Sequence, residues 1–264
     1  MIDYNLLVLQ NPWWGNREAI QQDEKIEEFK ASPIQYLPRQ ILALTPKDGA
    51  IYVLFGPRQT GKSTAIKLFI ESLLTNGTLP ESVFYFNCDA LDDRKDLIAL
   101  VLQYQESIGD QTGKIPLHYL FLDEVSAVAD WPYAIKWLAD TGKFQKSRII
   151  LAGSSSISLK KSGEFLPGRR KGGKDLTLLP IGYSDFISLT APDLFAAKVK
   201  SFQELKQLAT VAQNRRVSLR RLFEQFLLTG GFLKVINLVA QKRPVEDVAE
   251  LYKNTLRSEL AKSG

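Results

Sequence analysis

Short apolar runs recur between residues 50 and 180, and each is long enough for a strand. Stretches with helix-like spacing of apolar residues separate most of them. Continuous apolar runs are typical of strands buried on both faces, so the pattern predicts a parallel sheet covered by helices on both sides. The five expected strands are Ala50–Phe55, Ser82–Cys88, Leu117–Val125, Ser147–Gly153 and Lys174–Pro180.

The expected helices of this α/β core follow the first three strands. They lie at 62–75, at 94–105 and at 131–142, the last one capped by Asp130 and closed at Gly142. Before the core, an acidic helix stops at Pro33 and a turn follows at Thr45–Gly49.

From about Tyr183 onward the strand pattern ends, and three helices are expected. The first opens with Ser201 and Glu204, a capping box, the second ends at the glycine pair 230–231, and the third starts at Pro244. We therefore expect a linker segment at 1–45, an α/β core at 46–190, and at 191–264 a helical lid and the start of a C-terminal domain.

Composition narrows the classes of protein that fit. One cysteine and one histidine exclude disulfides, tetrahedral zinc sites and Cys/His nucleophile pairs within a single chain. No stretch approaches the roughly 20 apolar residues of a membrane span, and the N-terminus lacks the features of a signal peptide. We therefore expect a cytoplasmic protein that does not cross a membrane.

The charge is unevenly distributed along the chain. Residues 1–150 carry a formal charge of −4, whereas residues 151–264 carry +9. A basic half can bind an anionic partner such as nucleic acid, although solvated helices rich in lysine and arginine produce the same balance. No base-reading motif accompanies the charge, so a nucleic-acid partner stays one alternative.

The first expected strand leads into the sequence GPRQTGKST, which has the spacing G-x-x-x-x-G-K-[S/T] of a phosphate-binding loop. Glycines let backbone N–H groups approach an anion, the lysine adds a charge toward the β- and γ-phosphates, and the hydroxyl after it ligates Mg²⁺. The helix that follows points its positive end at the phosphates. The predicted nucleotide-binding residues are Gly56, Pro57, Arg58, Gln59, Thr60, Gly61, Lys62, Ser63 and Thr64.

The third expected strand ends in Asp123 and Glu124. At the carboxyl end of a parallel strand, Asp123 is placed to hold Mg²⁺ together with Ser63, and Glu124 to activate a water. The alternative is an ordinary acidic turn after a buried strand. The chain has neither the N-K-x-D motif of GTPases nor the LSGGQ signature of transporters, which favours adenine as the base.

Two further groups could complete the site. The fourth strand ends in AGSSS, where Ser154 or Ser155 could help to hold the γ-phosphate and the attacking water, or where the serines could mark only a turn. The basic loop after it contains Arg169, which could stabilise charge developing on the γ-phosphate, with Arg170 as the next candidate. An exposed loop of this composition can also be merely solvated.

Taken in order, NPWW, GPRQTGKST, YLFLDE, LAGSSS, LPGRRK, LTLLPIGYSDF and LLTGGF resemble a family of prokaryotic AAA-type ATPases. In that family such a core is followed by a C-terminal domain of unknown function. The resemblance runs from about Asn11 to Val235. It implies a P-loop sheet with strand order 5-1-4-3-2, ATP and Mg²⁺ as ligands, hydrolysis, and further chain beyond residue 264.

These observations together predict a Mg²⁺-dependent ATPase that couples hydrolysis to movement of a helical C-terminal part. A homo-oligomer or a partner protein is expected, because AAA-type sites often lie at subunit interfaces. Two alternatives stay open: a switch that binds ATP without hydrolysing it, and a DNA-associated protein that uses its basic half.

Overall fold

The structure is a computed structural model that describes residues 4–36, 44–112, 118–142, 144–154, 172–194, 215–244, 246–250, 252–253 and 257. The chain forms two compact units. The first comprises Met1–Ala31, Leu37–Pro57 and Gly61–Leu178, and the second comprises Ser32–Tyr36, Arg58–Thr60 and Leu179–Gly264.

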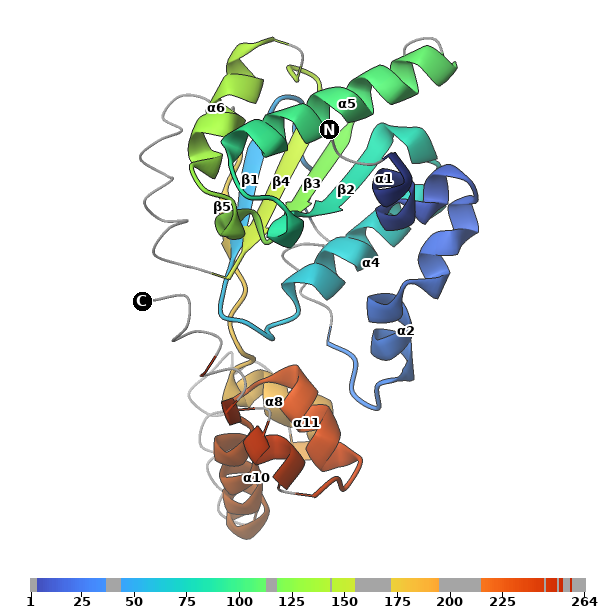
Figure 1. The fold of residues 1–264 in the computed structure, drawn as a ribbon. Helices are drawn as coiled ribbons and strands as arrows, with labels where there is room; N and C mark the ends of the chain where they lie inside the picture. Colours follow the sequence, from blue (N-terminus) through green and yellow to red (C-terminus); the bar gives the residue numbers. More distant parts are fainter. Residues whose placement is uncertain are drawn as a thin grey trace. The chain divides into compact units, whose positions relative to one another are not determined.

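The first unit contains a five-stranded parallel sheet, and every strand lies within a predicted apolar run (Figure 1). The strands are β1 (Ile51–Phe55), β2 (Val83–Asn87), β3 (Tyr119–Asp123), β4 (Arg148–Gly153) and β5 (Asp175–Thr177). Their order is β2-β3-β4-β1-β5, which read from the other edge is the predicted 5-1-4-3-2. The P-loop fold is therefore confirmed, with β4 inserted between β1 and β3.

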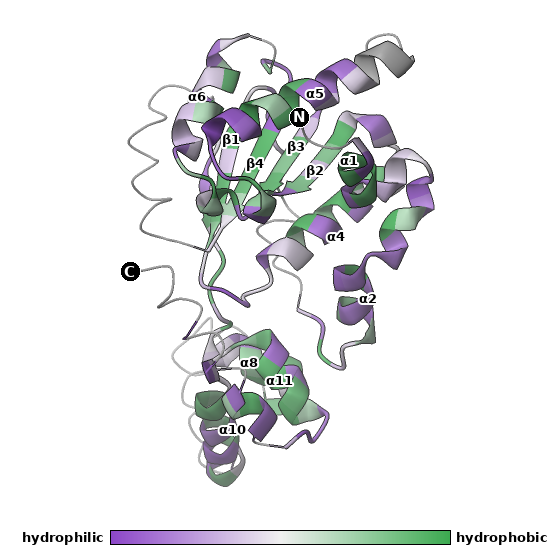
Figure 2. Cartoon of the chain, viewed as in Figure 1, coloured by the Kyte–Doolittle hydropathy of each residue, from purple (hydrophilic) through white to green (hydrophobic). Residues whose placement is uncertain are grey.

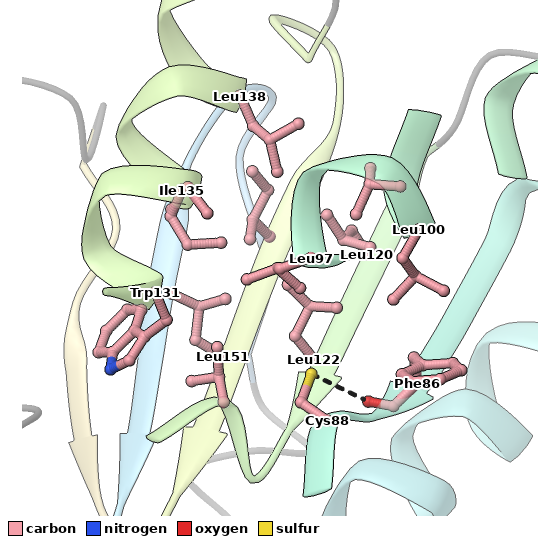
Figure 3. Packing of buried hydrophobic residues seen from close by; sticks show 14 of the residues in the cluster. Phe86, Cys88, Leu97, Leu100, Leu120, Leu122, Trp131, Ile135, Leu138 and Leu151 are labelled. Carbon is pink, nitrogen blue, oxygen red and sulfur yellow. Dashed lines mark hydrogen bonds between the residues drawn. The ribbon is translucent and has the colours of Figure 1, made fainter. Parts of the chain in front are cut away.

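Helices pack on both faces of the sheet. One face is covered by α5 (Arg94–Thr112) and α6 (Trp131–Asp140), whose apolar residues form one core with those of the strands (Figure 3). The other face is covered by α4 (Lys62–Thr75), with its own core around Phe69 and Phe121. Strands β2, β3 and β4 are coloured mainly as hydrophobic in Figure 2, as double burial requires.

The N-terminal segment is part of this unit and contains four short elements. They are α1 (Tyr4–Gln10), the 3₁₀ helices η1 (Pro12–Trp14) and η2 (Arg17–Gln22), and α2 (Glu24–Ala31). Further 3₁₀ turns lie at η3 (Pro80–Ser82), η4 (Cys88–Ala90) and η5 (Val125–Ala127).

A close approach explains one glycine of the basic loop region. A Cβ atom on Gly173 would lie 1.9 Å from the carbonyl oxygen of Ile51, so no larger residue fits where the chain enters β5 beside β1.

The second unit is helical in its described part. It contains α8 (Tyr183–Thr190), η6 (Pro192–Leu194), α10 (Arg216–Thr229) and α11 (Leu233–Ala240), with helical backbone also at 246–250. Phe186 and Ile236 are buried in its core, and the amide of Asn237 bonds both backbone groups of Ile34.

Some local expectations need correction. Asp130 precedes α6, but its side chain makes no capping bond, because its φ of 57° is left-handed and not the extended conformation of a capping residue. Helix α5 runs beyond its expected end at residue 105, and neither α8 nor α11 was expected. The expected ending of α10 is confirmed by Gly230, whose φ is 56°. The expected capping box of Ser201 and Glu204 lies outside the described residues.

Within the described residues, no helix is both long enough and apolar enough to cross a bilayer.

Candidate active site

Three of the parallel strands, β1, β3 and β4, lead at their carboxyl ends into described residues of the predicted site. Register pairs Phe55 of β1 with Gly153 of β4, and Asn87 of β2 with Asp123 of β3. The phosphate-binding loop therefore starts beside the residue that precedes Ser154, as expected for a parallel sheet.

The loop reaches α4 through Gly61, whose φ of 86° lies in the left-handed region where a side chain would be strained. Gly61 is the N-cap of α4, and as a glycine it supplies no capping side chain. Gln59 also has a positive φ, of 62°. The first N–H groups of a helix have no partner within the helix, so this end of α4 is suited to an anion.

Lys62 is folded back over the loop from the first position of α4. Its side chain is buried, with the residue 5% exposed, and Nζ donates to the carbonyl oxygens of Gly56 at 2.9 Å and Pro57 at 2.8 Å. The ammonium group is thus held against the loop whose glycine spacing predicts phosphate binding.

Asp123 is the last residue of β3 and is 1% exposed. Its Oδ1 accepts from the backbone N–H of Glu124 at 3.0 Å, its Oδ2 accepts from the Tyr85 hydroxyl at 3.2 Å, and the Ser63 hydroxyl also bonds the carboxyl group. Burial raises the pKa of the Asp123 carboxyl above its ordinary value, and the bond from Ser63 is the largest opposing effect.

These donors fit Mg²⁺ rather than a softer metal. Ser63 and Asp123 offer only oxygen, and Mg²⁺ is usually held by one or two such groups together with phosphate oxygens and waters. A cation there would also offset the cost of burying the carboxylate. No cluster of three or more His, Cys, Asp or Glu side chains occurs among the described residues that could hold a metal without a substrate.

Glu124 and Ser154 meet across the strand ends. The Ser154 hydroxyl, on a residue 6% exposed, donates to Oε2 of Glu124 at 3.1 Å. Glu124 has a left-handed backbone with a φ of 48°, so the chain turns sharply after β3. Ser155, Arg169 and Arg170 lie outside the described residues.

Sequence reasoning missed Tyr85 and its neighbour Lys67. Burial raises the pKa of the Tyr85 phenol, so its hydroxyl stays protonated and can donate to Asp123. Lys67 lies over the Tyr85 ring, and burial lowers the pKa of its ammonium group. The available signal was the alternation of β2, which places Tyr85 on the face of the sheet that carries Asp123.

Comparison with known proteins found one matching family. The family is described as an AAA domain, and it matches residues 48–187, which include the loop, Asp123, Glu124 and Ser154. No curated protein matched the sequence.

Several solved structures are similar at low sequence identity. The replication initiator DnaA bound to AMPPCP and single-stranded DNA is 12% identical, with a TM-score of 0.38 over 74% of this chain and 66% of that one. Cdc6p from Pyrobaculum aerophilum is 11% identical, with a TM-score of 0.37 over 71% and 52%. PCH-2 from C. elegans is 13% identical, with a TM-score of 0.42 over 98% and 70%. The chain thus spans between about half and two thirds of the length of the first two proteins.

Proposed function

Because this chain belongs to the family of AAA domains, we propose that it binds ATP together with Mg²⁺ and hydrolyses it. One observation carries the proposal. The hydroxyl of Ser63, next to the loop lysine, bonds the buried carboxyl group of Asp123 at the end of β3, two strands away from β1 in the sheet. In an ordinary acidic turn the carboxylate would stay in water, because burying it next to a phosphate-binding loop costs free energy.

Each residue has a distinct part in the proposed reaction. Lys62 and the N–H groups of the loop bind the β- and γ-phosphates, while Ser63 and Asp123 hold Mg²⁺. Mg²⁺, when bound, neutralises charge on the phosphates. Glu124 orients a water and accepts its proton.

The bond between Ser154 and Glu124 supports a role for Ser154 in orienting this base. Arg169 is proposed to stabilise charge on the γ-phosphate. The helical region at 191–264 is proposed to move as ATP is hydrolysed.

Turnover by the purified protein tests the proposal. Phosphate release from ATP should require Mg²⁺. The variant Glu124→Gln should bind ATP but release no phosphate, since the amide keeps the shape of the side chain without its basic group. Glu18→Gln makes the same chemical change at an exposed residue of η2 and should leave turnover unchanged.

The outcomes also separate the alternatives. Hydrolysis by Glu124→Gln at the wild-type rate would reduce Glu124 to a turn residue. Nucleotide binding without any turnover by the wild-type protein would favour the non-hydrolysing switch.

A further inference from the structure

Tyr85 reaches the proposed metal site from a neighbouring strand. Register pairs Tyr85 with Phe121 and Asn87 with Asp123, so Tyr85 is the diagonal neighbour of Asp123 on the same face of the sheet. An aromatic side chain can span that diagonal separation. The Tyr85 hydroxyl accordingly lies 3.2 Å from Oδ2 of Asp123 and donates to it.

The ring of Tyr85 is held in place by a buried cation. Nζ of Lys67 lies 3.7 Å from the ring centroid, and it pairs with Oδ2 of Asp23 at 3.1 Å. Lys67 follows Ser63 by four residues on α4, so both side chains share one face of the helix. The helix that brings Ser63 to Asp123 therefore also fixes the ring that bonds Asp123.

The backbone of Tyr85 is held as well. Nδ2 of Asn11 donates to the Tyr85 carbonyl oxygen at 2.8 Å, and the Tyr85 N–H donates to Oδ1 of Asn11 at 2.7 Å. Asn11 is fully buried. Tyr85 is thus fixed at its backbone, its ring and its hydroxyl, which is more than a residue needs merely to fill a core.

We propose that Tyr85 is a positioning residue for Mg²⁺: its hydroxyl keeps the Asp123 carboxylate oriented at Ser63 and so strengthens Mg²⁺-dependent nucleotide binding without touching the ion or the nucleotide. The proposal rests on the proposed function, because it requires Mg²⁺ at Asp123. Residues that orient a metal ligand by hydrogen bonding commonly contribute 10-fold or more to metal affinity.

Binding of a fluorescent ATP analogue to the full chain, titrated with Mg²⁺ and repeated in EDTA, tests this role. Tyr85→Phe keeps the ring beneath Lys67 and removes only the hydroxyl. It should raise the Mg²⁺ concentration for half-saturation about 10-fold, with affinity in EDTA close to that of the wild type.

Tyr104→Phe is the matched control. Tyr104 is a second buried tyrosine, and its hydroxyl bonds the backbone carbonyl of Glu81 away from the site. This variant also loses one hydroxyl bond from a core ring, so it should melt at a similar temperature to Tyr85→Phe. Its Mg²⁺ dependence should match that of the wild type.

A double-mutant cycle with Asp123→Asn shows whether Tyr85 acts through Asp123. In the Asp123→Asn background, removing the Tyr85 hydroxyl should cause no further loss of Mg²⁺ dependence. Additive losses would overturn the proposal, as would an unchanged Mg²⁺ requirement in Tyr85→Phe or an equal loss of binding with Mg²⁺ and in EDTA. A wild-type chain that binds no nucleotide would instead refute the proposed function itself.

Discussion

At the scale of single residues, the site is made of charged groups that the fold has taken out of water. Lys62 and Asp123 are both buried, and each is held by hydrogen bonds: Lys62 by carbonyl oxygens of its own loop, Asp123 by Ser63 and Tyr85. Burying a charge is costly unless it is paired or hydrogen-bonded. The site therefore already holds a positive group, Lys62, placed for phosphate and a negative group, Asp123, placed for a cation.

Replacing the loop lysine tests this arrangement. Lys62→Ala should weaken ATP binding by about 100-fold or more, because each hydrogen bond to a charged group contributes about 1.5–3 kcal/mol. Lys30→Ala removes an exposed lysine that pairs with Glu71 at 2.7 Å on the surface, and should leave affinity unchanged. Titration with a fluorescent ATP analogue measures both variants, and undiminished binding by Lys62→Ala would contradict the assignment of the loop.

At the scale of elements, side chains of the N-terminal segment cover the edge of the sheet that β2 forms. Strand β2 lies at one of the two edges of the sheet, and the indole N–H groups of Trp13 and Trp14 both donate to the carbonyl oxygen of Val83 at 3.0 Å. Asn11 bonds both backbone groups of Tyr85. Unpaired edges invite pairing with other chains, so the NPWW sequence protects this edge.

Asn11→Ala should lower the free energy of unfolding by about 3 kcal/mol, since it leaves two buried backbone groups of Tyr85 without partners. The control is Asn76→Ala, in which the lost amide is exposed and bonds the Ser72 hydroxyl at 3.3 Å, so the change should stay within about 0.5 kcal/mol. Urea unfolding followed by tryptophan fluorescence measures both. Equal losses in the two variants would show that the edge bonds add no specific stability.

At the scale of the whole molecule, the proposed role of Arg169 concerns assembly, because this residue follows the fourth strand in the basic loop, outside the phosphate-binding loop of its own chain. If Arg169 acts on the ATP that a neighbouring subunit binds, hydrolysis per chain should rise with protein concentration as the subunits associate.

Arg169→Ala should lower turnover by on the order of 10³, the contribution typical of such an arginine, while ATP affinity stays within a few-fold. Mixing it with Lys62→Ala should restore some phosphate release, because each chain supplies the group that the other lacks. Turnover that is independent of protein concentration, with no rescue on mixing, would contradict the proposal that Arg169 acts in the site of a neighbouring subunit. Arg170 would then be the next residue to replace.

The sequence by itself determined the strands of the sheet and predicted the main residues of the candidate site. Continuous apolar runs identify strands buried on both faces, and the spacing of Gly56, Gly61 and Lys62 identifies the loop, because both signals are local in the chain. These local signals do not give the order of the strands in the sheet. The resemblance to the AAA-type family implied it, and the parallel pairing of β4 between β3 and β1 confirmed it.

Only the tertiary structure decided which polar groups meet. Asn11 and Tyr85 are 74 residues apart, and Tyr85 and Asp123 are 38 apart, so their bonds depend on the register of β2 against β3 and on the path of the N-terminal segment. In the sequence Tyr85 is one of several aromatic residues in a buried strand. Its hydroxyl reaches Asp123 only in the observed register of β2 against β3, because a shift of one residue would turn the side chain to the other face of the sheet.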